Sequence, residues 1–128
     1  MIGCSGPAND DSLRHLNGLW EIEQVQLADG SVKDYKISEI VDKFNMEGNR
    51  GTRTKVRVNF TGDYFVAAAP DSVFVTSGEG GKITIEHRAQ YIKWTEQVIK
   101  LDSSHLVLRN AQGYEYRYKR HVPMNLKP

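Results

Sequence analysis

The chain has 128 residues, which is enough for one domain that buries a hydrophobic core without a metal ion or a disulfide. Hydrophobic residues make up 39% and charged residues 26%, as in an ordinary globular protein. The formal net charge of +1 excludes a general attraction to nucleic acid or to an anionic membrane, and no apolar run approaches the roughly 18 residues of a membrane-spanning helix.

Residues 1–12 are small and polar, so we expect them to form a flexible tether. They contain the single cysteine of the chain, Cys4, which follows a small residue and precedes a polar segment. This arrangement is typical of the lipidation site of bacterial lipoproteins. If Met1 was added to a trimmed chain, we expect Cys4 to be the acylated first residue of the mature protein. If Met1 is native, no signal peptide precedes Cys4 and the expectation fails.

After a short helical turn over residues 13–16, the first strand is expected over residues 19–27. It opens on Gly18-Leu19-Trp20, where the large ring can plug the base of a small closed barrel and the glycine lets the backbone turn in tightly. The apolar phase slips between Ile22 and Val25, which predicts a β-bulge near Glu23-Gln24.

The next apolar segment predicts the one helix of the chain. Ile37, Ile40, Val41 and Phe44 are spaced at i, i+3, i+4 and i+7, which makes one apolar stripe on a helix. We expect this helix to cover an open end or a side of the barrel.

The remainder reads as short strands separated by turn residues. In the first of them, Val56, Val58 and Phe60 are expected to face inward and Lys55 and Arg57 outward. The expected strands cover residues 32–35, 55–60, 64–69, 72–76, 82–91, 97–101, 105–108 and 114–120. The sequence therefore predicts an all-β domain over residues 13–122, a single antiparallel up-and-down barrel of about eight strands with one short helix, followed by a frayed tail over 123–128.

With its opening Gly18-Leu19-Trp20, its paired terminal strands and Cys4, the chain resembles the lipocalin-like lipoproteins of Bacteroidetes-type bacteria over residues 17–121. The resemblance implies a small barrel that binds small apolar molecules. In lipocalins a basic residue near the last strand packs across the tryptophan, and either Arg117 or Arg120 matches this role. The short loops and the lack of a disulfide differ from larger lipocalins and argue against a roomy cavity.

We expect no enzymatic activity, no cofactor and no metal. The sequence contains no nucleophile elbow, phosphate-binding loop or dinucleotide fingerprint, and its four histidines do not have the spacing of metal ligands. His87 shares a face with Ile83, Ile85 and Tyr91. We expect it to be a core or rim histidine that is hydrogen-bonded to a neighbour, with a ligand contact or a catalytic base as the alternative.

The expected function is non-catalytic binding of a small apolar or amphipathic molecule. The candidate ligand-binding residues, which alternatively just fill the core, are Trp20, Val58, Phe60, Ile85, His87, Tyr91, Tyr116 and Tyr118. A closed apolar cavity above about 300 Å³ would favour this function. The alternative is a protein-interaction module of an envelope complex, which a filled interior and an exposed aromatic patch would favour.

Two further features bear on a protein partner. Trp94 and Phe74 are expected outside the barrel, and Arg50, Arg53, Lys55 and Arg57 make a local basic cluster whose simplest interpretation is a solvated loop. We expect no nucleic-acid partner, because few aromatic residues alternate with the basic ones. We expect membrane contact only through a lipid at Cys4, and hence a location in the periplasm or at the cell surface, anchored in the outer membrane.

Overall fold

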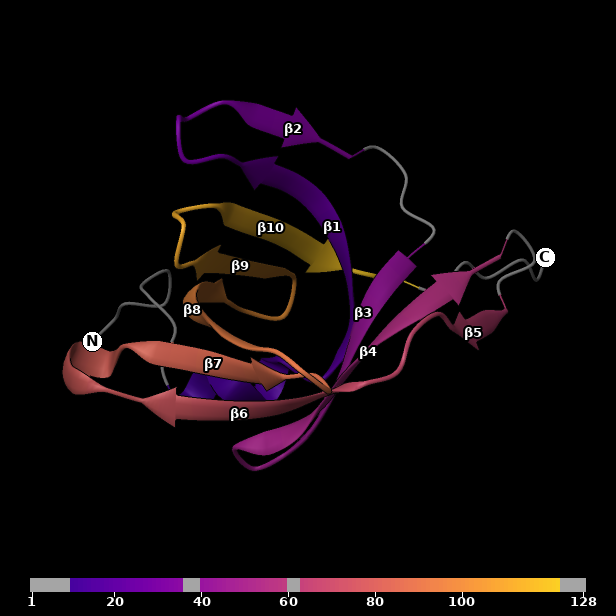
Figure 1. Ribbon diagram of the computed structural model, residues 1–128, viewed down its shortest axis with the longest axis horizontal. Coiled ribbons are helices and arrows are strands. Elements are labelled where there is room, and N and C mark those ends of the chain that lie inside the picture. Colours follow the sequence, from indigo (N-terminus) through magenta and orange to yellow (C-terminus); the bar gives the residue numbers. More distant parts are fainter. Residues whose placement is uncertain (1–9, 36–39, 60–62, 123–128) are drawn as a thin grey trace.

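The computed structural model describes residues 10–35, 40–59 and 63–122. It is built almost entirely of antiparallel strands (Figure 1). The strands are β1 (Gly18–Gln26), β2 (Val32–Asp34), β3 (Ile40–Glu47), β4 (Arg50–Val58), β5 (Tyr64–Val66), β6 (Asp71–Ser77), β7 (Ile83–Arg88), β8 (Lys93–Leu101), β9 (His105–Asn110) and β10 (Glu115–Arg120). Two short 3₁₀ helices cover Asp10–His15 and Glu79–Gly81, and the first overlaps the end of the expected tether.

The sheet closes on itself. Its strand order is β10-β9-β8-β7-β6-β4-β3-β1, and β10 pairs with β1, so that Trp20 lies opposite Arg120 and Val25 lies opposite Tyr116. The two remaining strands are additions outside the ring, because β2 pairs with β1 and β5 pairs with β4. The predicted closed antiparallel barrel is therefore confirmed, and the pairing of first and last strands leaves the eight-stranded ring without an open edge.

The predicted bulge in the first strand is also confirmed. The register of β1 against β10 shifts between Ile22 and Gln24. One extra residue reverses the alternation of side chains. As a result Ile22 and Val25 both face the interior, where they line the same cavity.

One end of the barrel is closed by Trp20. Its side chain is fully buried, and its indole Nε1 donates a hydrogen bond of 2.9 Å to the carbonyl oxygen of Leu16. The guanidinium of Arg120 lies 3.8 Å from the ring centroid and donates to the carbonyl oxygens of His15 and Asn17. Of the two candidates for the basic residue that packs across the tryptophan, Arg120 is therefore the one that does so.

Gly18 makes this approach possible. Its φ is +116°, which few other residues tolerate, and an added Cβ would lie 2.6 Å from Nη1 of Arg120. The apolar core above this end consists of Leu16, Trp20, Phe44, Val73, Val75, Ile83, Ile85, Val98, Leu101, Leu106 and Leu108.

The predicted helix is wrong where the structure describes it, because residues 40–47 form strand β3; Ile37 lies outside the described residues. This strand is buried on both faces. Phe44 points into the core, whereas Val41 packs beside Val56 on the outer face. When a strand has apolar residues on both faces, its sequence no longer alternates between apolar and polar residues. The apolar spacing can then match that of a helix, as it does here.

The expected orientation of β4 is also wrong. Val56 lines a groove on the outer face together with Tyr64 and Val66, and Val58 shares its parity opposite Tyr64. Lys55 lines the interior cavity instead. The inversion is stable because Val56 is buried beside Val41 on the outer face, and because the inward Arg53 and Lys55 form ion pairs with Asp71 and Asp42.

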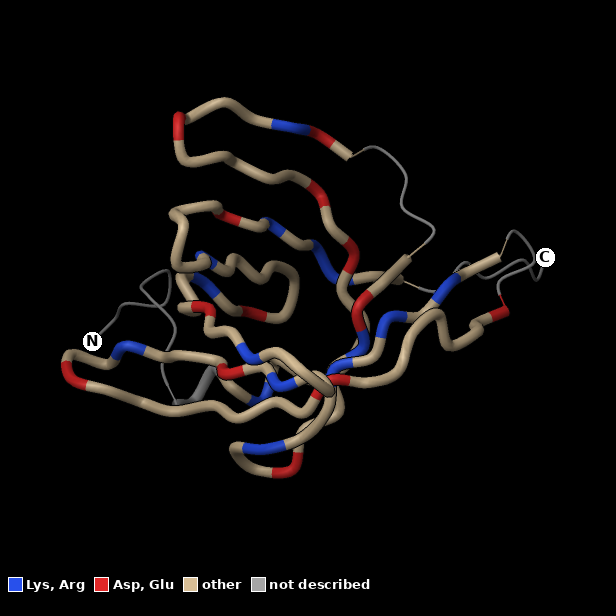
Figure 2. The backbone as a smooth tube through the Cα atoms, in the orientation of Figure 1, with Lys and Arg blue, Asp and Glu red and all other residues tan. Residues whose placement is uncertain are grey.

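Charged residues of both signs are interspersed along the described chain (Figure 2), in line with the small net charge. The expected basic cluster is not one patch. Arg53 and Lys55 face the interior, whereas Arg50 points to the outer face and lies over the ring of Phe74 at 5.6 Å. In the part of the chain that the structure describes, no helix is long and apolar enough to cross a membrane.

Candidate functional site at the open end of the barrel

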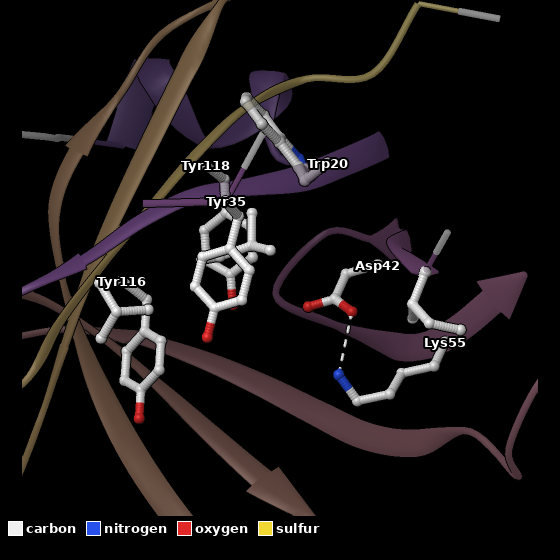
Figure 3. Close-up of a pocket in the computed structure, with 9 residues that line it drawn as sticks. Trp20, Tyr35, Asp42, Lys55, Tyr116 and Tyr118 are labelled. Carbon is white, nitrogen blue, oxygen red and sulfur yellow. Dashed lines mark hydrogen bonds and ion pairs between the residues drawn. The ribbon is translucent and has the colours of Figure 1, made fainter. Parts of the chain in front are cut away.

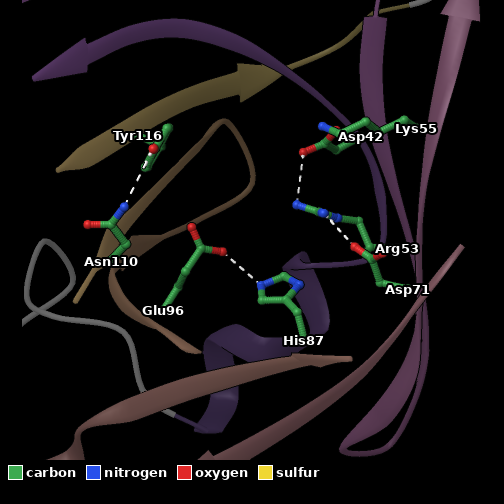
Figure 4. A network of polar contacts seen from close by, with 8 residues as sticks. All are labelled: Asp42, Arg53, Lys55, Asp71, His87, Glu96, Asn110 and Tyr116. Atoms are coloured by element: carbon green, nitrogen blue, oxygen red, sulfur yellow. Dashed lines mark hydrogen bonds and ion pairs between the residues drawn. The ribbon is translucent and has the colours of Figure 1, made fainter. Parts of the chain in front are cut away.

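The end of the barrel opposite Trp20 is polar. Each strand from β3 to β10 in the ring places a polar side chain here, just beyond the apolar core (Figure 4). These residues are Asp42, Arg53, Lys55, Asp71, His87, Glu96, Asn110 and Tyr116. Buried polar groups are costly unless they are paired, so each of these side chains is expected to have a partner or a function.

A cavity of about 220 Å³ lies inside this end (Figure 3). Its apolar wall is formed by Trp20, Ile22, Val25 and Ile40, and its polar wall by Tyr35, Asp42, Lys55, Tyr116 and Tyr118. The cavity is not sealed, because the side chain of Lys55 is 48% exposed. It is smaller and more polar than the closed apolar cavity that was expected to favour ligand binding. We refer to it as the inner cavity.

One side of the inner cavity is an ion-pair cluster. Arg53 contacts Asp71 at 2.5 Å and Asp42 at 3.8 Å, and Lys55 contacts Asp42 at 3.2 Å. Burial opposes the charge of Arg53, but the two carboxylates outweigh it and raise the pKa of the guanidinium. The cluster has two cations and two carboxylates, so it is balanced in charge, and Asp42 and Lys55 are its members that line the cavity.

A stacked aromatic pair lies elsewhere at the open end, outside the lining of the inner cavity. The rings of His87 and Trp94 lie opposite each other on β7 and β8, with centroids 4.9 Å apart and planes within 6°. The guanidinium of Arg53 lies 5.7 Å from the Trp94 centroid. Trp94 therefore faces the interior, and the expectation that it lies outside the barrel is wrong.

His87 also contacts Glu96. Its Nε2 lies 2.7 Å from Oε1 of Glu96, but the two atoms do not meet the angular requirements of a hydrogen bond. The short distance is thus a close polar contact without a directed hydrogen bond, and it is an ion pair only when the imidazole is protonated. Nδ1 of His87 has no hydrogen-bond partner among the described residues. The pair is almost wholly buried and imperfectly satisfied.

A second hollow, the rim pocket, has a volume of about 740 Å³. It is formed where β8 projects past the turn between β9 and β10. Its lining consists of Ile92, Lys93, Trp94, Thr95, Glu96, Asn110, Ala111, Gln112 and Tyr116. Tyr116 lines both the rim pocket and the inner cavity, and it is the residue that the two linings share.

The tyrosine hydroxyls at this end remain protonated over the physiological range. Burial, and then the negative charge of Glu96, raise the pKa of Tyr116. Burial also raises the pKa of Tyr118 strongly, with Asp42 and Glu96 acting in the same direction. Both hydroxyls can therefore donate hydrogen bonds to a bound molecule.

The structure brings together some of the candidate residues and separates others. Trp20, Tyr116 and Tyr118 line the inner cavity, and His87 borders the open end. Ile85 is fully buried in the packed core. Tyr91 was expected to face inward but is 90% exposed in the β7–β8 turn. Val58 was also expected to face inward but lies on the outer face of β4. Phe60 lies outside the described residues.

Sequence reasoning missed most of the polar residues at the open end. Asp42, Arg53, Asp71 and Glu96 were not candidates for the site, because charged residues in strands are usually assigned to the solvent face. One signal was available. The alternation of β10 correctly places Tyr114, Tyr116 and Tyr118 on one face, and tyrosines in a row on an inward face indicate a polar interior.

A separate hollow of about 520 Å³, the outer groove, lies on the outside of β3 and β4 next to β5. It is lined by Leu19, Lys43, Asn45, Thr52, Thr54, Val56, Tyr64, Phe65 and Val66. All three residues of β5 are exposed, and Val66 is 71% exposed. His121 joins Tyr64 to Glu21, through contacts of 3.1 and 2.9 Å.

A closed eight-stranded antiparallel barrel, sealed by a tryptophan that follows Gly18 and lies under a basic residue of the last strand, is a lipocalin-like barrel. Solved structures agree with this assignment of the fold. A lipocalin-like protein from Bacteroides uniformis is similar over 84% of this chain and 99% of its own, with a TM-score of 0.53 and 17% identity. An uncharacterized protein from Bacteroides eggerthii is similar over 83% of this chain and 99% of its own, with a TM-score of 0.53 and 14% identity.

Apocrustacyanin C1 is similar over 88% of this chain and 64% of its own, with a TM-score of 0.50 and 9% identity. No protein-family model and no curated protein sequence matches the chain significantly. Within the described ranges no group of three or more His, Cys, Asp or Glu residues is arranged to hold a metal ion. The similarities concern the fold alone.

Proposed function

We propose that the open end of this barrel binds a small amphipathic molecule without catalysing a reaction on it. The observation that carries the proposal is that one residue, Tyr116, lines both the inner cavity and the rim pocket. The inner cavity offers an apolar wall that ends on Trp20, and the rim pocket offers aromatic and polar side chains. An apolar wall with a few convergent polar groups is the usual character of a small-molecule site.

The volumes limit the kind of ligand. The inner cavity of about 220 Å³ corresponds to roughly seven water molecules at about 30 Å³ each, which is less than a typical drug-sized pocket. Only a small apolar group fits there. The larger part of the ligand then lies in the rim pocket of about 740 Å³, next to Trp94 and Glu96. This division favours an amphipathic ligand over a wholly apolar one.

The experiment has two parts. Native mass spectrometry of the protein purified from its own host should detect a co-purified small molecule. In the second part, the neutral probe N-phenyl-1-naphthylamine is titrated into the wild type, Tyr116→Ala and Phe65→Ala. We expect Tyr116→Ala to weaken binding by about tenfold and Phe65→Ala to leave it unchanged. Tyr116 lines the inner cavity and the rim pocket, whereas Phe65 lines the outer groove.

Failure to find any bound small molecule or any probe binding would contradict the proposal. Loss of probe binding in Phe65→Ala alone would move the site to the outer groove.

The alternative function is that of a protein-interaction module. One observation favours it: the outer groove of about 520 Å³ presents Tyr64, Phe65 and Val66 to solvent. Contiguous exposed apolar residues commonly mark a protein contact. A photo-reactive amino acid placed at Phe65 in the host should then crosslink to one protein partner, whereas the same group at exposed Thr76 should not. Equal crosslinking from both positions would contradict the alternative.

We also propose that the protein is a lipoprotein of the cell envelope, tethered through Cys4. The support is the local sequence alone, a small residue before the cysteine and a polar segment after it. Metabolic labelling in the host with an alkyne-bearing fatty acid should label the wild type and not Cys4→Ser. Equal labelling of the two proteins, or none, would contradict the tether and leave the ligand proposal untouched.

A further inference from the structure

We infer that the rim pocket selects ligands that carry a protonated amine, with Glu96 as the counter-ion and the rings of Trp94 and Tyr116 beside the cation. The inference rests on the proposed function of the open end and names the ligand chemistry of that same site. It follows from the charge balance, from the unmet hydrogen-bonding capacity of Glu96 and from the walls of the pocket.

The charges at the open end fall into two groups. Arg53 and Lys55 are matched by Asp42 and Asp71 in the ion-pair cluster. Glu96 has no such partner, because its one charged or chargeable contact in the described part of the chain is His87. A buried carboxylate without a cation is unfavourable. Among these acidic groups, Glu96 is therefore the one that a ligand cation can compensate.

The contact with His87 does not satisfy Glu96. Glu96 is only 8% exposed, and its Oε1 lies 2.7 Å from Nε2 of His87 at an angle unsuited to a hydrogen bond. That oxygen has no hydrogen-bond partner within the described residues. Oε1 itself is buried against His87, but Glu96 lines the rim pocket, so its carboxylate can be approached from there by an ammonium group, which has three donors.

The remaining polar groups of the rim pocket do not compete for this cation. Oδ1 of Asn110 already accepts hydrogen bonds of 3.0 Å from the backbone N–H groups of Gln112 and Tyr114, so it holds the turn in place. Lys93 faces the opposite side of β8 from Glu96, and no ion pair joins the two in the described structure. Glu96 is thus the charged acceptor that the pocket offers to a ligand.

The aromatic walls suit the same chemistry. Cations bind favourably over the faces of Trp and Tyr rings. The Trp94 ring is fixed in position by stacking on His87, and Arg53 already lies near it. The positive charge of Arg53 does not exclude a second cation, since Asp42 and Asp71 offset it.

An anionic ligand is disfavoured by the same contacts. Arg53 and Lys55 are already in ion pairs, and Lys93, which also lines the rim pocket, lies on the opposite side of β8 from Glu96. An anion would have to displace Asp71 or Asp42 from these ion pairs and would also face the charge of Glu96. We therefore expect acids to bind more weakly than alcohols of the same length.

The test is a comparison of matched ligands on the full chain. Hexylamine, hexanol and hexanoate are titrated by isothermal calorimetry at pH 7 and constant salt. Hexylamine should bind about tenfold more tightly than hexanol, because a charge-assisted hydrogen bond is roughly twice as strong as a neutral one. Hexanoate should be the weakest of the three.

Two variants complete the test. The Glu96→Gln variant should lose the preference for the amine, so that it binds hexylamine and hexanol with equal affinity. Glu86→Gln is the matched control, since Glu86 lies one strand away and pairs with Arg88 on the outer face; it should keep the tenfold preference. If circular dichroism shows that Glu96→Gln does not fold, the order of affinity of the wild type for the three ligands still tests the inference.

Equal binding of amine and alcohol, tightest binding of hexanoate, or an unchanged preference in folded Glu96→Gln would overturn the inference. In those cases binding of hexanol still supports the proposed function. Absence of binding by all three ligands, together with no co-purified molecule, would overturn the proposed function as well.

Discussion

Removal of the Trp20 ring tests the architecture at the point where the chain closes. The side chain is fully buried, donates a hydrogen bond of 2.9 Å to the Leu16 carbonyl oxygen, and carries the Arg120 guanidinium 3.8 Å above its centroid. In Trp20→Ala all three contributions are lost together. A cavity then opens next to the seam between β1 and β10, where neighbouring groups are held by the sheet and cannot collapse into it.

The expected loss can be estimated from these contacts. Truncation of a buried aromatic residue to alanine costs about 3–5 kcal/mol. The lost hydrogen bond is worth about 1 kcal/mol net and the cation–π contact about 0.5–2 kcal/mol. These contributions overlap, so we expect the upper part of the range, about 4–5 kcal/mol. A domain of this size has a total stability of only about 5–15 kcal/mol.

The assay is urea unfolding followed by far-UV circular dichroism, because the substitution also removes one of the two tryptophan fluorophores. Trp94→Ala is the matched control. Trp94 is only partly buried at the open end, so its removal should cost clearly less than that of Trp20. A loss below about 1 kcal/mol for Trp20→Ala, or a larger loss for Trp94→Ala, would refute the role of Trp20 as the plug.

Three further predictions concern other parts of the barrel. Gly18→Ala should cost about 1–3 kcal/mol in urea, because its φ is +116° and the new Cβ would push Arg120 off the indole; a variant as stable as the wild type would contradict this. Hydrogen bonding from Arg109 holds the pKa of Glu115 below its ordinary value of 4.5, so its stabilisation is present above that pH and is lost on acidification; the melting-temperature difference between wild type and Glu115→Gln should be present at pH 7 and shrink by pH 3, and a constant difference would disprove it. Phe65→Ser should leave the free energy of unfolding within about 0.5 kcal/mol of the wild type, because the ring is 54% exposed, and a much larger loss would show that the outer groove is part of the core.

The closed barrel could be predicted because its signals are local and agree with one another. Gly18 and Trp20 mark the sealed end, and the slip of phase between Ile22 and Val25 marks the bulge that the register shows. The choice between Arg117 and Arg120 follows from the alternation of β10. Arg120 shares the inward face of Tyr116 and Tyr118 and lies opposite Trp20, whereas Arg117 is on the other face and donates to Gln24.

The polar interior could not be predicted because it depends on contacts between distant strands. The alternation of β4 is clear, yet it does not say which face is buried. Val56 is buried beside Val41 on the outside, and Arg53 is satisfied on the inside by Asp42 and Asp71, so the usual orientation is reversed. Without the partners in view, a charged residue on a strand is assigned to solvent.

The binding of a small molecule at the open end is tested most directly by nuclear magnetic resonance. The ¹⁵N-labelled full chain is titrated with hexylamine, and the backbone amide shifts are mapped onto the fold. The largest shifts should fall at Trp94, Glu96 and Tyr116, with Phe65 and Val66 unmoved. Shifts confined to Phe65 and Val66, or no shifts at saturating ligand, would contradict binding at the open end.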